Sequence, residues 1–282
     1  MPKLEIKYKG KDIDFLLHDL PQHLSRREAG HLSEIILGKT YSIVNNLKPE
    51  VIIDIGAHIG AASFFFAKSY PKSQIFSFEP TTMNFSLLEK NMKYFQNVKI
   101  FHKGIYEENK KQKIYINTTN PGTNSIHEKW RKFDNYEYAD FINLKDFLKK
   151  NNIKHIDILK IDTEGCEINI IQSIKSFITK ISVIYLEYHS EEQGLKIRNL
   201  LSSTHNIKKH QLCGIETVSL NDSIVGKIIL ENITHNGNTI IFRGQTINPK
   251  HVMELRKIGY LPIKVQSKQL GEICFVNKKI NL

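Results

Sequence analysis

The 282-residue chain is 40% hydrophobic and 24% charged, which is typical of a globular protein. Its 40 Lys and Arg residues outnumber its 29 Asp and Glu residues, so the formal net charge is +11. A basic surface attracts nucleic acid and other acidic partners. The lysines are spread along the chain, however, which favours a general compositional bias over a nucleic-acid partner.

The first fifty residues are predicted to form an N-terminal cap, with a hairpin in residues 3–17 and a helix in residues 27–38 that ends at Gly38. From residue 51, strands and helices alternate regularly. Strands are predicted at 51–54, 74–79, 97–102, 155–162 and 180–189, with an added strand at 111–117. Helices are predicted at 60–70, 81–95, 144–152, 166–179 and 191–203.

The pattern becomes weaker after residue 204. It indicates strands at 206–212, 226–232 and 237–244, a helix at 248–260, and a terminal hairpin at 261–279. Which of these strands completes the main sheet stays open. The alternation before residue 204 predicts an α/β fold, with a mainly parallel sheet and helices on both faces.

Targeting and redox signals are few. Cys166, Cys213 and Cys274 lie far apart, and no pair has the spacing of a zinc or redox motif. A reducing compartment fits this pattern best. The N-terminus lacks the apolar core of a signal peptide, and no apolar run approaches the ~20 residues of a membrane helix. We therefore expect a cytoplasmic protein without a membrane span.

Carboxylates end most of the predicted strands. Open parallel sheets bind ligands at the carboxyl ends of their strands. Four predicted strands end in an acidic residue: Asp54, Glu79, Asp162 and Glu187. Because burial of a charge is unfavourable, these residues are expected to line a ligand cleft or to be paired. The alternative is that these acids cap the helices that follow. Capping partly accounts for the presence of an acid at Asp162, but hardly for Glu79, because Pro80 follows it.

The stretch VIIDIGAHIG, residues 51–60, places a glycine turn directly after a buried strand. His58 occupies the position of the middle glycine in a dinucleotide fingerprint, so a pyrophosphate is obstructed. No Gly-Lys-Ser/Thr follows, which excludes a phosphate-binding P-loop. S-adenosylmethionine is an adenosine ligand without phosphate. Glu79 suits its ribose hydroxyls, and Gly56 and Gly60 permit close backbone contact with its methionine part.

Electrostatics favours the same ligand. The sulfonium of S-adenosylmethionine is positive, and several carboxylates around it are favourable. Asp54 is expected to brace the glycine turn or to meet the ammonium group of the ligand through water.

The segments VIIDIGAHIG, FSFEP, INLKDFL, IDILKIDTEGCE and VIYLEYH together resemble the FkbM family of S-adenosylmethionine-dependent methyltransferases. The resemblance covers roughly residues 41–203, and LKIDTEGCE at 159–167 is its most specific part. It implies a class I, Rossmann-like methyltransferase fold and methyl transfer to a hydroxyl of a sugar or another small metabolite. We expect the chain to consist of the cap at 1–50, a methyltransferase domain at 51–230, and an extension at 231–282 that packs on or completes the sheet.

The resemblance also implies roles for single residues. The residues implied to hold the cofactor are Asp54, Gly56, Ala57, His58, Gly60 and Glu79, with Lys103 and Gly104 near the adenine. Asp162 and Glu164 are implied at the methyl-transfer end. Two departures stand out: His58 replaces the more usual asparagine, and the third strand ends without an acid or amide for the adenine.

A hydroxyl acceptor needs a base within hydrogen-bond reach. Asp162, at the end of a buried strand, is one candidate, with an N-cap role as its alternative. Glu164 lies in the following turn, facing the acceptor or only solvent. Glu187 and His189 lie two residues apart on one extended run, so their side chains point the same way. They form either a base with its orienting partner or a salt-bridged pair at the rim.

Other possibilities are weaker. Two carboxylates and a histidine also suit a divalent metal, but the spacing is not diagnostic and no metal site is predicted. The aromatic stretch 130–141 is expected to be a surface flap, with an acceptor wall as the alternative. An RNA methyltransferase with the same cofactor site, an NAD-dependent oxidoreductase and an inactive binding module are the rival functions. The sequence identifies neither the acceptor nor the oligomeric state.

Overall fold

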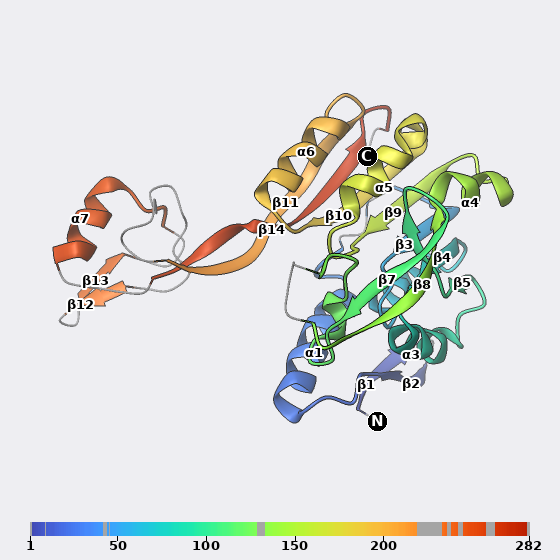
Figure 1. Ribbon diagram of the computed structural model, residues 1–282, viewed down its shortest axis with the longest axis horizontal. Helices are drawn as coiled ribbons and strands as arrows, with labels where there is room; N and C mark the ends of the chain where they lie inside the picture. The colour runs from blue at the N-terminus through green and yellow to red at the C-terminus, as the bar shows by residue number, and fades with distance from the viewer. Residues whose placement is uncertain are drawn as a thin grey trace. The chain divides into compact units, whose positions relative to one another are not determined.

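A computed structural model describes residues 2–8, 10–41, 44, 46–128, 133–218, 233–235, 238–241, 245–257 and 263–280 (Figure 1). The chain divides into two compact units. The first contains Met1–Glu187, Leu195–Lys209 and Ile273–Leu282, and the second contains Tyr188–Gly194 and His210–Glu272. The three-segment division expected from the sequence stays a prediction.

The main sheet has seven strands in the order β11-β14-β10-β9-β3-β4-β5. The five strands from β10 to β5 pair in parallel throughout, which confirms the expected fold class. The bounds of the seven strands are β3 Val51–Ile55, β4 Gln74–Phe78, β5 Val98–Phe101, β9 Ile156–Ile161, β10 Ile181–Tyr188, β11 His205–Val218 and β14 Ile263–Asn277.

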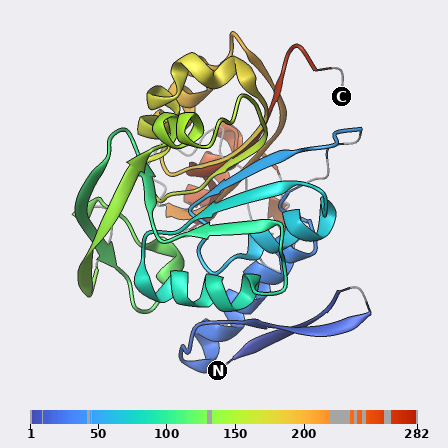
Figure 2. The same ribbon diagram turned by 90° about the vertical axis from the view of Figure 1, so that its right-hand side faces the viewer.

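Helices follow the parallel strands and cover both faces of the sheet. Helix α1 contacts α2, which contacts α3, and α4 contacts α5. The first group and the α4–α5 pair lie on opposite sides of the sheet (Figure 2). The bounds are α1 Gln22–Ile36, α2 Ala61–Ser69, α3 Thr82–Met92, α4 Leu144–Lys150, α5 Glu167–Ser173 and α6 Glu191–Leu201.

Burial on both faces explains the composition of the central elements. In β3, Ile52, Ile53 and Ile55 are buried and leave no polar alternation. Helix α2 is buried from Ala61 to Ala67, so it is apolar around most of its circumference. Strand and helix together position the loop 56–60 between them.

The N-terminal cap packs on this core. Strands β1 (Lys3–Tyr8) and β2 (Lys11–Leu16) form the expected hairpin, and the following helix α1 ends just before Gly38, whose φ is +74°. Asn91 of α3 accepts a hydrogen bond from the amide of Leu16 at 2.7 Å. Its side-chain amide donates to the carbonyls of Leu16 and Ile59, at 3.0 and 2.8 Å. One side chain therefore joins the hairpin to the glycine loop.

Three local expectations are wrong. The terminal hairpin is absent, because Ile263–Asn277 form one strand that lies between β10 and β11. The expected flap is instead partly the strand β8 (Asn135–Asn143), in a small sheet with β6 (Gly104–Tyr106) and β7 (Lys110–Ile116). Helix α5 stops at Ser173 and continues as a 3-10 helix over Lys175–Lys180.

The second unit contains β12 (Ile233–His235), β13 (Asn238–Ile241) and α7 (Pro249–Lys257), and its two strands pair antiparallel. The expected strand at 226–232 and residues 129–132 of the aromatic stretch lie outside the described residues. Among the helices that the structure describes, none has the length and apolar character needed to cross a bilayer.

Substitution of Gly56 by alanine is predicted to lower the free energy of unfolding by about 4 kcal/mol or more. The residue has φ +75°, and a Cβ there would lie 1.8 Å from the carbonyl oxygen of Asp162. Gly10→Ala is the matched control, because φ is +76° but no atom lies within 4 Å of its Cβ. It should lose only about 1–2 kcal/mol. Urea denaturation measures both, and equal losses would contradict the argument from backbone crowding.

Candidate functional site

The carboxyl ends of β4, β3 and β9 meet at the glycine loop. The amides of Gly56 and Ala57 both donate to the carbonyl of Phe78, at 3.0 and 2.9 Å. On the other side, the amide of Asp162 donates to the carbonyl of Ile55 at 3.1 Å. Backbone hydrogen bonds therefore hold Glu79 and Asp162 at one edge of the sheet, on either side of the loop.

Both loop glycines are required by the packing of the protein itself. Asp162 crowds Gly56, as described above. Gly60 precedes α2 with φ +98°, and a Cβ there would lie 2.9 Å from Leu88 and Met92 side-chain atoms. Ala57 is buried between them. The loop therefore approaches the adjoining strand and helix as closely as glycine permits.

Asp54 lies beneath the loop and is fully buried. One carboxylate oxygen accepts a hydrogen bond from Ser63 of α2 at 2.6 Å, and Ser63 contacts the hydroxyl of Ser77 in β4 at 2.8 Å. The other oxygen lies 3.2 Å from the ammonium of Lys160. These contacts brace the turn from below, whereas a contact of Asp54 with a cofactor stays a prediction.

Lys160 of β9 supplies a positive charge beneath the loop. Its ammonium donates to the carbonyl of Gly56 at 2.6 Å and lies 3.7 Å from Asp162. Burial lowers the pKa of Lys160, but the carboxylates of Asp54 and Asp162 outweigh burial and raise it above its ordinary value. The lysine therefore stays charged at neutral pH. Glu187 of β10 adds to the same attraction.

Glu79 directly follows β4 and is 4% exposed. One oxygen accepts from the amide and the hydroxyl of Thr81, at 3.0 and 2.6 Å, and from the side chain of Asn84 at 3.3 Å. The other accepts from the amide of His58 at 2.9 Å. Burial raises the pKa of Glu79, and these hydrogen bonds oppose the shift. The carboxylate is fixed in one orientation, with fewer donors on the oxygen that faces His58.

His58 has a left-handed backbone, with φ +52°, which is uncommon outside glycine. Its ring lies 5.1 Å from the ring of His18. Its Nε2 atom is shielded from solvent and has no hydrogen-bond partner in the described part of the chain. Burial, followed by the charges of His18 and Lys160, lowers the pKa of His58 well below its usual value. The ring is therefore neutral at pH 7.

The turn after β9 is fixed by Glu167, which is fully buried. Its carboxylate accepts from the amide of Thr163 at 2.9 Å and from the amide of Gly165 at 3.1 Å. Glu164, between them, has φ +53°, and its carbonyl accepts from Ser125 at 2.7 Å. The Glu167 carboxylate thus holds the backbone of the turn in place. The hydrogen bond from Ser125 connects the turn to the loop that follows β7.

The family model of the methyltransferase FkbM domain matches residues 54–211, more than half of the 282-residue chain. The chain belongs to the FkbM methyltransferase family. The matched FkbM domain contains the glycine loop, Glu79, Lys160 and the turn with Glu167. The sheet described above is thus the Rossmann-like methyltransferase sheet expected from the sequence.

Curated relatives agree with this family. The 2-O-methyltransferase NoeI of Sinorhizobium fredii is 26% identical over 160 residues, which are 51% of this chain and 66% of that protein. Methyltransferase 1 of Beauveria bassiana is 26% identical over 161 residues, 50% of this chain and 65% of its own. Methyltransferase sdnD of Sordaria araneosa is 24% identical over 183 residues, which cover 54% of this chain and 71% of that protein. The chain spans just under two thirds of the first two relatives.

The remaining predicted site residues lie in other elements of the chain. Lys103 is half-exposed and pairs with Asp140 at 3.6 Å, while Gly104 begins β6 and packs on Phe141. Their place beside an adenine stays a prediction. His189 belongs to the second unit, where its amide donates to the side chain of Gln193 at 2.7 Å. Glu187 belongs to the first unit, so the pair falls on either side of the division.

Three further residues of this site escaped the sequence analysis. Lys160 stands near the end of the strand IDILKI and is itself buried, where a lysine indicates a buried partner. Asn84 bonds Glu79 and the carbonyl of Pro121, at 3.3 and 3.2 Å. Ser63 bonds Asp54. Only Lys160 gave a signal in the sequence, because its position conflicts with the pattern of a buried strand.

The effects of Lys160 and Asp54 on stability are predicted to be coupled, because the two side chains form a buried ion pair. Lys160→Met should lower the free energy of unfolding by about 3–5 kcal/mol, because it leaves a buried carboxylate without its ion pair. The double variant with Asp54→Asn should lose clearly less than the sum of the two single losses. Urea denaturation supplies the four values of the cycle.

The control for this cycle is Lys103→Met, because the Lys103–Asp140 pair is largely exposed. It should change stability by less than about 1 kcal/mol. Additive losses for Asp54 and Lys160 would show that the two charges do not depend on one another.

Proposed function

We propose that this protein is an S-adenosylmethionine-dependent O-methyltransferase that acts on a hydroxyl of a sugar, a glycan or another small metabolite. The observation that carries the proposal is the site at the ends of β4, β3 and β9, where the FkbM glycine loop, Glu79 and Asp162 come together. The acidic residues around the loop suit a cationic methyl donor.

Glu79 is the proposed ligand of the ribose hydroxyls. Its two oxygens are fixed by His58, Thr81 and Asn84, so the carboxylate is oriented before the cofactor binds. Burial raises the pKa of Glu79, and the hydrogen bonds that it accepts partly offset this shift by stabilising the carboxylate. The glycine loop would contact the methionine part through its backbone.

Methyl transfer from a sulfonium is an in-line displacement, which an enzyme promotes by alignment and by exclusion of water. The acceptor hydroxyl loses its proton as the new carbon–oxygen bond forms. Asp162 is the proposed base: its side chain is 30% exposed, so an acceptor reaches it, and Lys160 at 3.7 Å orients it. Glu164, Glu187 and His189 remain further candidates for contact with the acceptor.

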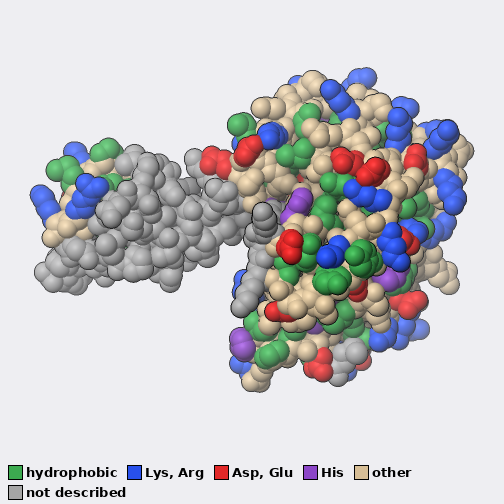
Figure 3. Space-filling view, viewed as in Figure 1, with side chains coloured by type: hydrophobic (Ala, Val, Ile, Leu, Met, Phe, Trp, Pro, Cys, Tyr) green, Lys and Arg blue, Asp and Glu red, His purple; other side chains and the backbone are tan. Residues whose placement is uncertain are grey.

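The choice of a hydroxyl acceptor has two supports. NoeI is named as a 2-O-methyltransferase, and the FkbM family is typically associated with hydroxyl acceptors. RNA is the alternative acceptor suggested by the net charge of +11. In the face shown in Figure 3, however, Lys and Arg side chains of the first unit are scattered with Asp and Glu among them, and form no single basic patch.

Glu79→Gln is predicted to weaken binding of S-adenosylhomocysteine by at least about tenfold, because a hydrogen bond to a charged group contributes about 1.5–3 kcal/mol. Isothermal titration calorimetry on the folded variant measures the loss. Glu89→Gln, an exposed position on α3, is the control and should bind like the parent protein. Failure of the parent protein to bind either S-adenosylmethionine or S-adenosylhomocysteine below millimolar concentration would end the proposal.

Asp162→Asn is predicted to reduce the methyl-transfer rate by about 10²–10⁴-fold with little change in cofactor affinity, because it removes a base without removing a cofactor contact. The assay incubates the protein with deuteromethyl-labelled cofactor and a panel of sugars and oligosaccharides, and follows the mass increase. Total RNA and NAD serve as the competing arms. Labelling of RNA alone, or thermal protection by NAD alone, would replace the proposed function by one of the rivals.

A further inference from the structure

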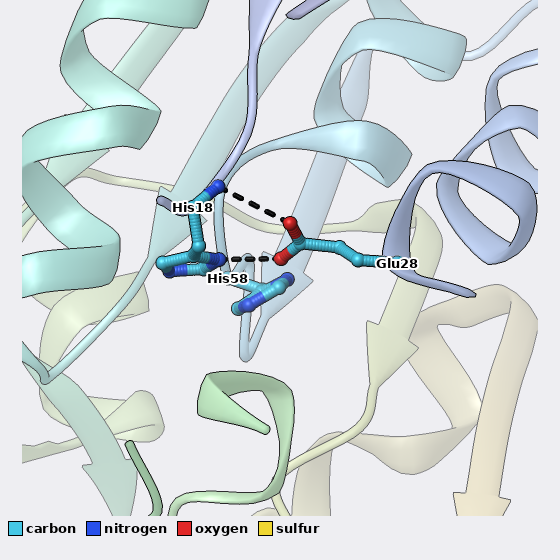
Figure 4. A group of neighbouring side chains, drawn as sticks. All are labelled: His18, Glu28 and His58. Carbon is cyan, nitrogen blue, oxygen red and sulfur yellow. Dashed lines mark hydrogen bonds and ion pairs between the residues drawn. The ribbon is translucent and has the colours of Figure 1, made fainter. Parts of the chain in front are cut away.

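A cluster of His18, Glu28 and His58 lies where the N-terminal cap meets the glycine loop (Figure 4). His18 follows β2, Glu28 is on α1, and His58 is in the loop after β3. One ring nitrogen or carboxylate oxygen from each residue lies within 4.8 Å of the others. Nothing in the methyl-transfer mechanism uses His18 or Glu28.

Asn84 determines how His18 is protonated. The Nδ2 atom of Asn84 donates to Glu79 and to the carbonyl of Pro121, so its oxygen is the atom that faces His18. The Nε2 atom of His18 lies 2.9 Å from that oxygen and must carry the hydrogen. In the neutral ring, Nδ1 then presents a lone pair.

The lone pair on Nδ1 of His18 faces a lone pair on the carboxylate of Glu28. The Nδ1 atom of His18 contacts Oε1 of Glu28, whose second oxygen accepts the amide of His18 at 3.1 Å. The side chains are only 1% and 10% exposed, so water does not separate them. Two lone pairs repel one another, so the contact as it stands requires a proton between the two atoms. A metal ion could take the place of this proton once the two atoms move apart.

His58 distinguishes these two cations. A proton shared by His18 and Glu28 leaves the nearby imidazole of His58 with its buried Nε2 unsatisfied, and an unsatisfied buried polar atom is unfavourable. A metal ion that takes the Nε2 lone pair of His58, together with those of His18 and Glu28, would satisfy all three side chains. The hydrogen bond from His18 to Asn84 is moreover the kind of outer contact that orients a histidine ligand.

We propose that His18, Glu28 and His58 bind a divalent transition-metal ion of the zinc class. Two imidazoles and one carboxylate are ligands typical of Zn²⁺ and its neighbours, whereas Mg²⁺ and Ca²⁺ prefer oxygen ligands alone. Ligand atoms lie about 2.0–2.2 Å from Zn²⁺, so His18 and Glu28 would move apart from their direct contact to share one ion with His58. Three protein ligands leave a position open for water.

Such an ion would bind the N-terminal cap to the cofactor loop. The proposal does not depend on methyl transfer, because metal binding is measured without substrate or cofactor. Its ligands come from residues 18, 28 and 58, two of which precede the match to the FkbM domain. The site is therefore a property of this chain and not of the family domain alone.

The test uses the full chain, freed of metal with EDTA and dialysed. Titration with Zn²⁺ should show one equivalent bound and a raised Tm, and Co²⁺ should give the visible absorption of a low-coordinate site with nitrogen ligands. Mg²⁺ should neither bind in its place nor alter the Tm. Absence of stoichiometric Zn²⁺ binding, or an equal response to Mg²⁺, would overturn the proposal.

Two variants identify the ligands. His58→Asn retains a residue that tolerates positive φ, and Glu28→Gln retains size and shape. Each should weaken Zn²⁺ binding at least about tenfold, whereas His23→Ala, at an exposed position on the same helix as Glu28, should not. Circular dichroism checks folding, and His58→Asn decides the question if Glu28→Gln is unfolded. Unchanged affinity in His58→Asn would place the bound metal elsewhere.

Discussion

The site depends on the ionic contacts and hydrogen bond that the buried ammonium of Lys160 makes. The ammonium lies near the end of the buried strand β9 and joins Asp54, Asp162 and the carbonyl of Gly56. Without it, carboxylates at the ends of neighbouring strands would repel one another in a medium of low dielectric constant. The ammonium of Lys160 holds the loop through the carbonyl of Gly56, and the hydroxyl of Ser63 holds Asp54 by a hydrogen bond to its second oxygen. One buried cation thus permits an acidic rim for a cationic ligand.

The architecture followed from local patterns in the sequence. Apolar runs of the right length, interrupted by helical periodicity, located the five parallel strands and most helices to within a few residues. The acids at strand ends and the glycine turn located the edge at which the site lies. Each of these signals is carried by residues that are neighbours in the chain, which is why a single sequence reveals them.

Other features depend on residues that are distant in the chain. The space in front of Gly56 is filled by the carbonyl of Asp162, which no sequence spacing discloses. The long strand Ile263–Asn277 resembles a hairpin because its glycine and polar residues suggest a turn. The aromatic residues of β8 suggested a flap, and their pairing with β7 makes them a strand. Glu28 and His18 gave no signal, because their partner lies in another element.

The place of β14 in the sheet has a consequence for how the molecule forms. Strand β14 lies between β10 and β11, yet it comes after both in the chain. During synthesis those two strands leave the ribosome with no neighbour on the facing sides, and unpaired strand edges invite association with other chains. The nascent chain therefore carries two unpaired strand edges until about sixty more residues, through the end of β14, have been synthesised and the sheet can be completed.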